Sequence, residues 1–574
     1  MKHLLLLFLC FFLQHVVIAQ GVSFNATGAA PHASAMLDVQ SNTRGVLFPR
    51  MMAGQRAGIV SPAMGLLVYE NDSQSFWYLD STFWVKILTG KSGWSLTGNN
   101  SGTQAFLGTT NNQSLLFKAN NQQAGKIDLV FLNTFWGNNA GSSNTTGTNN
   151  TALGRNALFT NTTGIANSAM GEGTLLTNTT GYYNSAIGIE ALNSNTVGNL
   201  NTAIGSLALK ANTTGSENTA VGYAASYLNT TGFSNVAIGT RALFNNQTGY
   251  NLIAVGDSAL FHNVGGLFNG MQNTALGSKA LFENTSGGYN TALGFWALRD
   301  NTTGSQNTAI GPLALLNNST GTYNTATGHN TLHHNNGNNN TSTGSLTLYE
   351  NTTGSNNTAN GRSALQSNTY GYSNVAIGVF TLYENLSGHN LVAVGDSALF
   401  KNILGYENTA VGSKAGANTT SGFNNSFFGF RAGYSNTTGS SNTAIGDEAL
   451  TFNNDGYNNT AIGFNSLRNN LSGYNNTANG IGSLEFNTTG RLNTASGNNS
   501  LQSNTIGSYN TTCGSNSLQS NISGSYNNVI GYAALNNNTS GYSNVAIGVR
   551  ALYLNQSGHN QVAVGDSALF YNNG

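Results

Sequence analysis

Hydrophobic and polar residues recur along most of the chain in a 17-residue unit that begins near Asn133 and continues to the last residue. Its consensus is N-T-A-I-G-x-x-A-L-x-x-N-T-T-G-x-x, and residues 201–215 show it as NTAIGSLALKANTTG. We call the glycine that closes N-T-A-I-G the anchor glycine. There are 26 anchor glycines from Gly137 to Gly565, and 23 of the 25 intervals between them are 17 residues long. A fixed period this short is typical of a solenoid, whose coils bury their apolar side chains against one another.

Within the unit, the pattern predicts two short strands, one at T-A-I and one at A-L and the residue after it. Frequent glycine, asparagine and threonine exclude an α-helical solenoid. The N-T-T-G segment predicts a turn, because Asn and Gly tolerate positive φ and Thr hydroxyls bond the local backbone. One unit has four extra residues after His262, and another lacks one residue within 333–340. Both changes lie in the N-T-T-G segment, which therefore predicts an outer loop.

Two apolar columns predict the interior. The residue before the anchor glycine is usually Ile, Val or Leu (the aliphatic column), and the residue four after it is Leu in 22 of 26 units (the leucine column). Alanine recurs two residues before the anchor glycine and three after it. We expect both apolar columns to face inward. We also expect the polar residues that interrupt the aliphatic column to form hydrogen-bonded ladders inside the coil: Thr327, Thr343, Asn360, Asn479 and Ser496.

A single coil cannot be stable alone. Burying one Ile and one Leu contributes about 1.5–3 kcal/mol each, whereas ordering each residue of the unit costs roughly 1–2 kcal/mol. Strand ladders, stacked Asn and Thr side chains and packing between chains must supply the difference. The predicted fold is all-β, a parallel β-roll or β-solenoid of about 26 coils. At ~4.8 Å per coil, the rod would be about 125 Å long.

The residues before the array have a different texture. Residues 1–19 are predicted to be a secretory signal peptide, with Lys2 before an apolar run and Val-Ile-Ala at its end. Residues 20–93 predict an N-terminal β module, and residues 94–132 a connecting β segment before the repeats at 133–574. The predicted strands of this region lie at 35–39, 46–48, 66–69, 76–79, 83–87, 106–107 and 115–118.

An aromatic cluster lies within this N-terminal module, with hairpin turns predicted at 71–73 and 80–81. It predicts either the core of a small β domain that caps the array or a carbohydrate-stacking surface. A cap would protect the open strand edge of the solenoid. The cluster consists of Phe76, Trp77, Tyr78, Phe83 and Trp84.

Composition excludes several classes of partner. Charged residues are 7% of the chain, with 20 basic and 20 acidic side chains, so the protein has no electrostatic means of binding nucleic acid or an anionic membrane. The 39% of hydrophobic residues occupy fixed repeat positions, which argues against disorder. No stretch after the leader has 18 uninterrupted apolar residues, so no membrane-spanning helix is predicted. No cofactor is predicted.

Cysteine and histidine give no sign of a bridge or a metal site. Cys10 lies in the predicted leader, so Cys513 has no partner in the exported chain. Cys513 replaces a residue of the aliphatic column and is predicted to be a small buried hydrophobe. His333 and His334 are adjacent but have no Cys or carboxylate at metal-ligand spacing.

The motif NTAIG…AL…NTTG resembles the head repeats of trimeric autotransporter adhesins. That resemblance implies a left-handed parallel β-roll in which three chains pack about one axis. Residues 21–131, through ASAMLDVQSNTRGVLFPRM and GLLVYENDSQSFWYLDSTFWVKI, resemble N-terminal regions of repetitive secreted proteins of Bacteroidetes-type bacteria and of phage-like fibres. The sequence departs from these families because it has no heptad stalk, no C-terminal membrane anchor and no self-cleaving chaperone domain. Because the chain stops at Gly574 inside a repeat, we expect it either to be incomplete at its C-terminus or to engage a partner there.

Three nearly identical blocks begin at residues 235, 374 and 544, and each contains Asp-Ser-Ala. They predict either ligand sites spaced along a fibre or duplication of multi-repeat blocks. The Asp-Ser-Ala triplets resemble the O-glycosylation motif of Bacteroidetes, which makes Ser258, Ser397 and Ser567 candidate O-glycosylation sites.

The sequence favours a non-catalytic structural fibre or adhesin, secreted or on the cell surface. We expect a homotrimer whose loops attach to a host surface, a matrix or a glycan. An ice- or surface-binding solenoid is an alternative, prompted by the regular Thr and Asn; against it, the paired Thr residues are predicted to lie in turns. A polysaccharide-acting β-helix enzyme is a second alternative, but such chemistry needs paired carboxylates, and acids are sparse in the array.

Overall fold

The computed structural model describes residues 21–87, 107–266 and 270–572. The predicted signal peptide at 1–19 lies outside these residues. The chain divides into two compact units, Met1–Thr109 and Thr110–Gly574, and each is described by itself.

The N-terminal unit contains two small sheets. In the first, β1 (Val22–Asn25) pairs in parallel with β2 (Leu37–Gln40). The second has the order β3-β4-β5-β6, and a short helix, α2 (Ala53–Ala57), follows its first strand. Its strands are β3 (Arg50–Met51), β4 (Leu67–Glu70), β5 (Ser75–Asp80) and β6 (Phe83–Lys86).

Both predicted hairpins are confirmed, because β4 pairs antiparallel with β5, and β5 with β6. The strand predicted at 46–48 is wrong, since pairing with β4 begins only at Arg50. Of the strand predicted at 106–107, Phe106 lies outside the described residues and Leu107 is not in a strand. Two rings of the aromatic cluster, Trp77 and Trp84, lie near Arg56, whose guanidinium is 4.0 Å and 5.4 Å from their centroids and forms an ion pair with Glu70.

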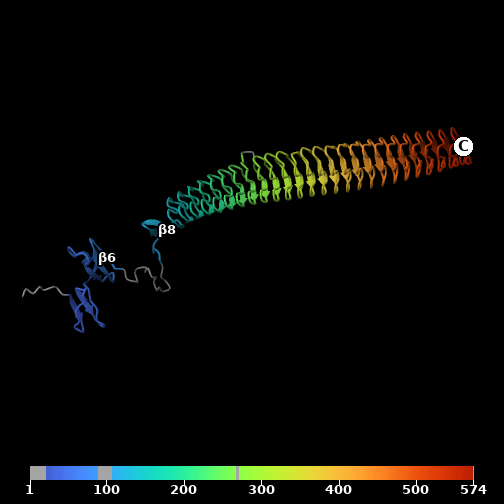
Figure 1. The fold of residues 1–574 in the computed structure, drawn as a ribbon. Helices are drawn as coiled ribbons and strands as arrows, with labels where there is room; N and C mark the ends of the chain where they lie inside the picture. The colour runs from blue at the N-terminus through green and yellow to red at the C-terminus, as the bar shows by residue number, and fades with distance from the viewer. Residues whose placement is uncertain (1–20, 88–106, 267–269, 573–574) are drawn as a thin grey trace, which may run out of the picture. The chain divides into compact units, whose positions relative to one another are not determined.

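The second unit is a long, gently curved rod with one strand in each coil (Figure 1). It begins with an antiparallel hairpin, β7 (Leu115–Ala119) and β8 (Gln122–Asp128), and β8 pairs antiparallel with β9. From β9 onward each strand pairs in parallel with the next, through to β34. The hairpin from the predicted connecting segment therefore covers the edge of the first coil, as solenoid ends require.

The 26 strands of the array each precede an anchor glycine. They are β9 (Asn133–Trp136), β10 (Thr151–Leu153), β11 (Ser168–Met170), β12 (Ser185–Ile187), β13 (Thr202–Ile204), β14 (Thr219–Val221), β15 (Val236–Ile238), β16 (Ile253–Val255), β17 (Thr274–Leu276), β18 (Thr291–Leu293), β19 (Thr308–Ile310), β20 (Thr325–Thr327), β21 (Thr341–Thr343), β22 (Thr358–Asn360), β23 (Val375–Ile377), β24 (Val392–Val394), β25 (Thr409–Val411), β26 (Ser426–Phe428), β27 (Thr443–Ile445), β28 (Thr460–Ile462), β29 (Thr477–Asn479), β30 (Thr494–Ser496), β31 (Thr511–Cys513), β32 (Asn528–Ile530), β33 (Val545–Ile547) and β34 (Val562–Val564).

The strand at T-A-I is confirmed, but the second predicted strand, at A-L, is wrong. The residues after the anchor glycine form successive turns, and leucines such as Leu207 and Leu209 have φ of 64° and 50°. The left-handed conformation costs an L-residue roughly 1–2 kcal/mol. Hydrogen bonds between coils help to offset this cost: the N–H of Leu209 donates to the carbonyl of Ala225 at 2.9 Å.

The anchor glycine is required by both conformation and space. Gly205 has a φ of 130°, and a Cβ added to it would lie 2.5 Å from the carbonyl oxygen of Gly222 in the next coil. No side chain fits at that distance, and the conformation itself disfavours one. The strict recurrence of this glycine therefore reflects the close stacking of successive backbones.

Two columns of buried asparagines complete the interior beside the leucines and alanines. In the N-T-T-G column, Asn212 donates through Nδ2 to Asn195 Oδ1 (2.7 Å) and to the Gly215 carbonyl (2.9 Å). In the column before each strand, Asn201 Oδ1 accepts the backbone N–H of Asn218 at 3.0 Å. These amides are fully buried. Because their polar atoms are paired, burying them carries no large desolvation penalty.

The N-T-T-G segment is therefore only partly an outer edge. Its Asn and Gly face inward, while its two threonines face outward. The first hydroxyl donates to the next coil, as when Thr213 Oγ1 donates to the Thr230 carbonyl at 3.0 Å. The stacked Asn and Thr side chains expected from the sequence are thus present.

Three of the four exceptions in the leucine column, Gly141, Gly416 and Gly433, are matched by changes elsewhere in the core. Phe427 replaces an inner alanine and is fully buried. A Cβ added to Gly433 would lie 2.5 Å from its ring, and one added to Gly416 would lie 2.7 Å from it. Phe135 fills the same space beside Gly141, where an added Cβ would lie 2.5 Å from the ring. At these three glycines the missing leucine is therefore compensated by a phenylalanine.

Both irregular units keep the strand register. Ile253 pairs with Thr274 across the unit with extra residues, and Thr325 pairs with Thr341 across the short unit. The changes in length thus lie outside the strand ladder, as predicted.

Candidate functional site

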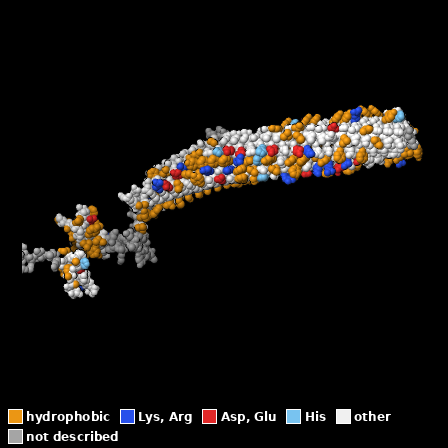
Figure 2. All heavy atoms as spheres, viewed as in Figure 1, with side chains coloured by type: hydrophobic (Ala, Val, Ile, Leu, Met, Phe, Trp, Pro, Cys, Tyr) orange, Lys and Arg blue, Asp and Glu red, His pale blue; other side chains and the backbone are white. Residues whose placement is uncertain are grey.

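The first candidate surface is the strand face, made by the outward residues of β9–β34. The prediction that the aliphatic column faces inward is wrong. The middle alanine of each strand is buried, whereas Ile204, Ile445 and Leu276 are 40%, 41% and 44% exposed. Adjacent residues of a strand point to opposite faces, so burying the alanine turns its aliphatic neighbour outward. Figure 2 shows hydrophobic side chains over much of the visible face of the rod.

Two further predictions about this column are wrong for the same reason. Cys513 is exposed and does not act as a buried hydrophobe. The polar residues that interrupt the column face outward and form no interior ladder (Thr327, Thr343, Asn360, Asn479 and Ser496). The first residue of most strands is a threonine that also lies on this face, whereas the paired threonines of N-T-T-G lie in turns, as predicted.

Aromatic side chains form a second kind of feature, in which rings stack along the rod axis. Tyr372, His389, Tyr406 and Phe423 stack at centroid distances of 4.7–5.3 Å, with interplanar angles of at most 11°. Similar pairs recur in each of the three duplicated blocks. Inner rings of such a stack have both faces covered. These ladders therefore stabilise the coils and leave little ring face for a ligand.

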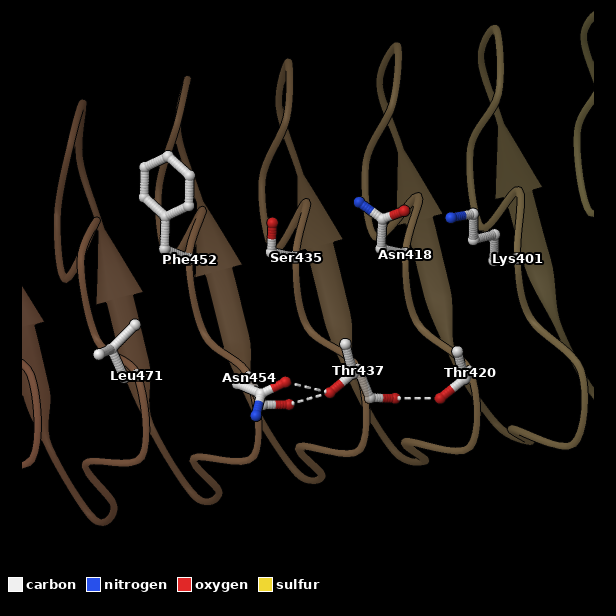
Figure 3. A pocket seen from close by; sticks show the side chains of 8 residues that line it. All are labelled: Lys401, Asn418, Thr420, Ser435, Thr437, Phe452, Asn454 and Leu471. Atoms are coloured by element: carbon white, nitrogen blue, oxygen red, sulfur yellow. Dashed lines mark hydrogen bonds between the residues drawn. The ribbon is translucent and has the colours of Figure 1, made fainter.

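The third feature is a shallow groove of about 430 Å³. It lies on the face formed by the turns that follow the anchor glycines, which we call the turn face. Figure 3 shows two rows of side chains, one from each edge of the groove. They are Lys401, Asn418, Ser435 and Phe452 in one row, and Thr420, Thr437, Asn454 and Leu471 in the other.

Small residues between two larger ones create this groove. Asn418 and Ser435 occupy the same repeat position as Lys401 and Phe452 on either side of them. The guanidinium of Arg468 lies 5.3 Å from the centroid of the Phe452 ring. Because no larger side chain stands at position 435, the ring is open toward the groove, unlike the rings in the aromatic ladders.

Polar groups along the groove are available to a ligand. Among the described residues, Lys401 has no ion-pair partner, and the side chains of Asn418 and Ser435 form no hydrogen bond. Thr437 Oγ1 donates to Asn454, and Thr420 Oγ1 to the Thr437 carbonyl, which fixes the opposite edge. The groove therefore offers an ammonium, amides, a hydroxyl and a ring face. Together these groups suit a polar ligand that carries an acidic substituent.

This groove was not predicted from the sequence, although a signal was present. Comparing coils at one repeat position, instead of along the chain, would have shown the two small residues between Lys401 and Phe452. None of the eight lining residues is an acid. The groove therefore lacks the carboxylate pair that glycoside hydrolysis uses.

The candidate glycosylation serines all directly follow an exposed aspartate in a tight bend. They differ in accessibility, since Ser258 is 9% exposed and Ser567 lies on the surface. Their backbone φ values are 54–56°. Glycosylation at Ser258, Ser397 and Ser567 stays a prediction.

Histidines do not gather into a metal site. Within residues 21–87, 107–266 and 270–572, no group of three or more His, Cys, Asp or Glu could hold a metal ion. His333 is half-buried, and its ring lies 4.3 Å from that of His334. Burial, and secondarily the charge of His334, lowers the pKa of His333 to about 4. No helix in the described part of the chain is both long and apolar enough to span a membrane.

Comparison with known proteins adds one match. Residues 25–104 match the family of phage tail like trimerisation regions. No curated protein and no solved structure is significantly similar to the chain. The trimerisation match and the solenoid together support a homotrimeric, fibre-like repeat protein.

Proposed function

We propose that this protein is a non-catalytic structural fibre, secreted or on the cell surface, that uses the turn face of its rod for attachment. The rod form, the trimerisation match and the near-neutral charge support a fibre. The groove between Lys401 and Phe452 supports attachment. It combines an open ring face with an ammonium that has no ion pair and with Asn418 and Ser435 side chains that form no hydrogen bond within the described residues.

The ligand class follows from the groove lining. A saccharide ring would stack on Phe452, its hydroxyls would bond Asn418 and Ser435, and an acidic substituent would pair with Lys401. Lys401 and Phe452 lie three coils apart, about 14 Å at ~4.8 Å per coil. This span suits an oligosaccharide better than a single sugar. The attachment target is therefore an acidic glycan.

Calorimetric titration with a uronic-acid hexasaccharide and its carboxyl-reduced, neutral counterpart tests the proposal. We expect the acidic form to bind more tightly, Phe452→Ala to weaken both, and Lys401→Ala to remove the preference. Phe486→Ala is the matched control, since Phe486 occupies the same repeat position outside the groove and is similarly exposed. Equal heats for the wild type and Phe452→Ala, or no binding of the acidic form, would refute attachment through this groove.

A further inference from the structure

The strand face carries an aliphatic column along the rod, beside a column that is mostly threonine. The aliphatic column places an outward Ile, Val or Leu in most coils of the rod, and successive coils are ~4.8 Å apart. Soluble monomers rarely expose apolar patches this extensive. The residues that match a trimerisation region belong to the same chain, so further copies of the chain are the partners at hand. We take the occupant of the strand face to be a second and a third copy of the solenoid.

Such packing leaves the register between copies undefined. Where every rung presents Ile, Val or Leu, one rod can slide by a coil and still bury apolar against apolar side chains. Register is weakly specified on uniform faces of this kind. A defined register therefore requires positions in the aliphatic column where the residue type differs from the repeat.

The aliphatic column contains two such groups of positions, nine coils apart. The first is Thr327, Thr343 and Asn360 on β20–β22, and the second is Asn479, Ser496 and Cys513 on β29–β31. We call these six residues the polar rungs. Within the described residues, the hydroxyl and amide groups of the polar rungs form no hydrogen bond to their own chain. Their hydrogen-bonding capacity is available to another copy.

We propose that the polar rungs set the register in which the copies pack, each polar rung lying level with the same rung of its neighbours. In register, Asn360 meets Asn360, and amides can bond each other. A slip of one coil places Asn360 of one copy level with Ile377 of the other, and Asn479 of that other copy level with Ile462 of the first, which buries unpaired amides. A single polar residue fixes the register of coiled coils by the same physics. This inference rests on the trimer but not on the groove.

Cys513 is a built-in reporter, because register brings the thiols of different copies to one level. The experiment oxidises the full secreted chain with copper phenanthroline and dioxygen, which takes up the two electrons as a disulfide forms. We expect a trimer by light scattering and a disulfide-linked dimer on a non-reducing gel. A monomer would overturn packing of copies, and a trimer without the cross-link would overturn the in-register arrangement.

A uniform-column variant tests the role of the polar rungs. It carries Thr327→Val, Thr343→Val, Asn360→Ile, Asn479→Ile and Ser496→Val and keeps Cys513. These residue types occupy the same position in other coils, so the coils should still form. We expect a trimer in which the yield of the Cys513 cross-link falls several-fold. An unchanged yield would show that register is set elsewhere and would overturn the proposal.

Mixed assembly gives a positive signal for the slip. A copy with Cys513→Ser and Ile530→Cys carries its thiol one rung away, so a cross-link to Cys513 of another copy reports a one-coil offset. We expect this cross-link only on the uniform-column background. The matched control changes five loop threonines to valine: Thr214, Thr231, Thr303, Thr438 and Thr489. An equal offset signal in that control would overturn the assignment to the polar rungs.

Discussion

A double-mutant cycle can test whether Phe427 compensates for the leucines that are missing at positions 416 and 433. Phe427→Ala removes a fully buried ring, and no neighbouring side chain can fill the space because residues 416 and 433 are glycines. Truncations of this kind cost about 3–5 kcal/mol. Gly433→Leu alone should also destabilise, by about 1–3 kcal/mol, because its Cβ would lie 2.5 Å from the Phe427 ring.

The double variant should be more stable than the sum of the two single changes predicts. It restores the Ala and Leu pattern of the next coil, where Leu450 has a φ of 54°, close to the 63° of Gly433. The backbone at 433 therefore already accepts leucine. We expect a favourable coupling of about 2–3 kcal/mol, the upper range for residues in contact.

Hydrogen exchange by mass spectrometry suits a solenoid, because coils open locally and global unfolding is not a two-state process. The readout is the opening free energy of amides between 410 and 450. Phe427→Ala combined with Leu552→Ala, seven coils away, should be additive and serves as the control. If Phe427→Ala/Gly433→Leu exchanges as fast as the sum of its single changes predicts, compensation is refuted.

Three further predictions concern the ladder, the anchor glycine and pH. Thr419 interrupts the N-T-T-G asparagine column with an unpaired buried hydroxyl, so Thr419→Asn should slow exchange in this coil by about 1 kcal/mol of opening free energy; unchanged exchange would contradict it. Gly205→Ala should sharply destabilise its coil, unlike Gly54→Ala in α2, whose Cβ meets nothing within 4 Å; equal thermal melting of the two would refute the steric argument. Because burial holds the pKa of His333 near 4, the unfolded chain takes up a proton near pH 6.5 before the fold does, so coil stability should fall from pH 6.5 to 4 and level off below. His333→Phe should remove that decline in exchange measured at matched pH, and a persisting decline would assign it to other groups.

Much of the architecture could be predicted because the repeat imposes it. The spacing of anchor glycines such as Gly205 gives the coil count, and T-A-I marks the strand. The orientation of Ile204 could not be predicted from its hydrophobicity, because an aliphatic side chain suits both a core and an interface between chains. The alanine beside it was the better guide, since a small residue is what fits at the inner position of a coil whose interior already holds a leucine.

The predicted second strand failed for a different reason. Leucine at position 209 disfavours positive φ by its own propensity, and only hydrogen bonds and burial in the stacked coils compensate for that cost. No local rule contains those interactions. The groove was missed for a related reason, since it depends on residues that are neighbours across coils and are separated by a full repeat in the sequence.

The two irregular units show that loop length and strand register are independent. Four residues added after His262, or one removed before Asn340, leave the neighbouring strands paired in register. The two loops therefore accept changes in length while the coils keep a fixed spacing, so they are suitable sites for inserting peptides at a defined separation. Peptides inserted at these two loops would project four coils apart, about 19 Å at ~4.8 Å per coil, and each further coil between insertion points would lengthen that separation by one fixed step.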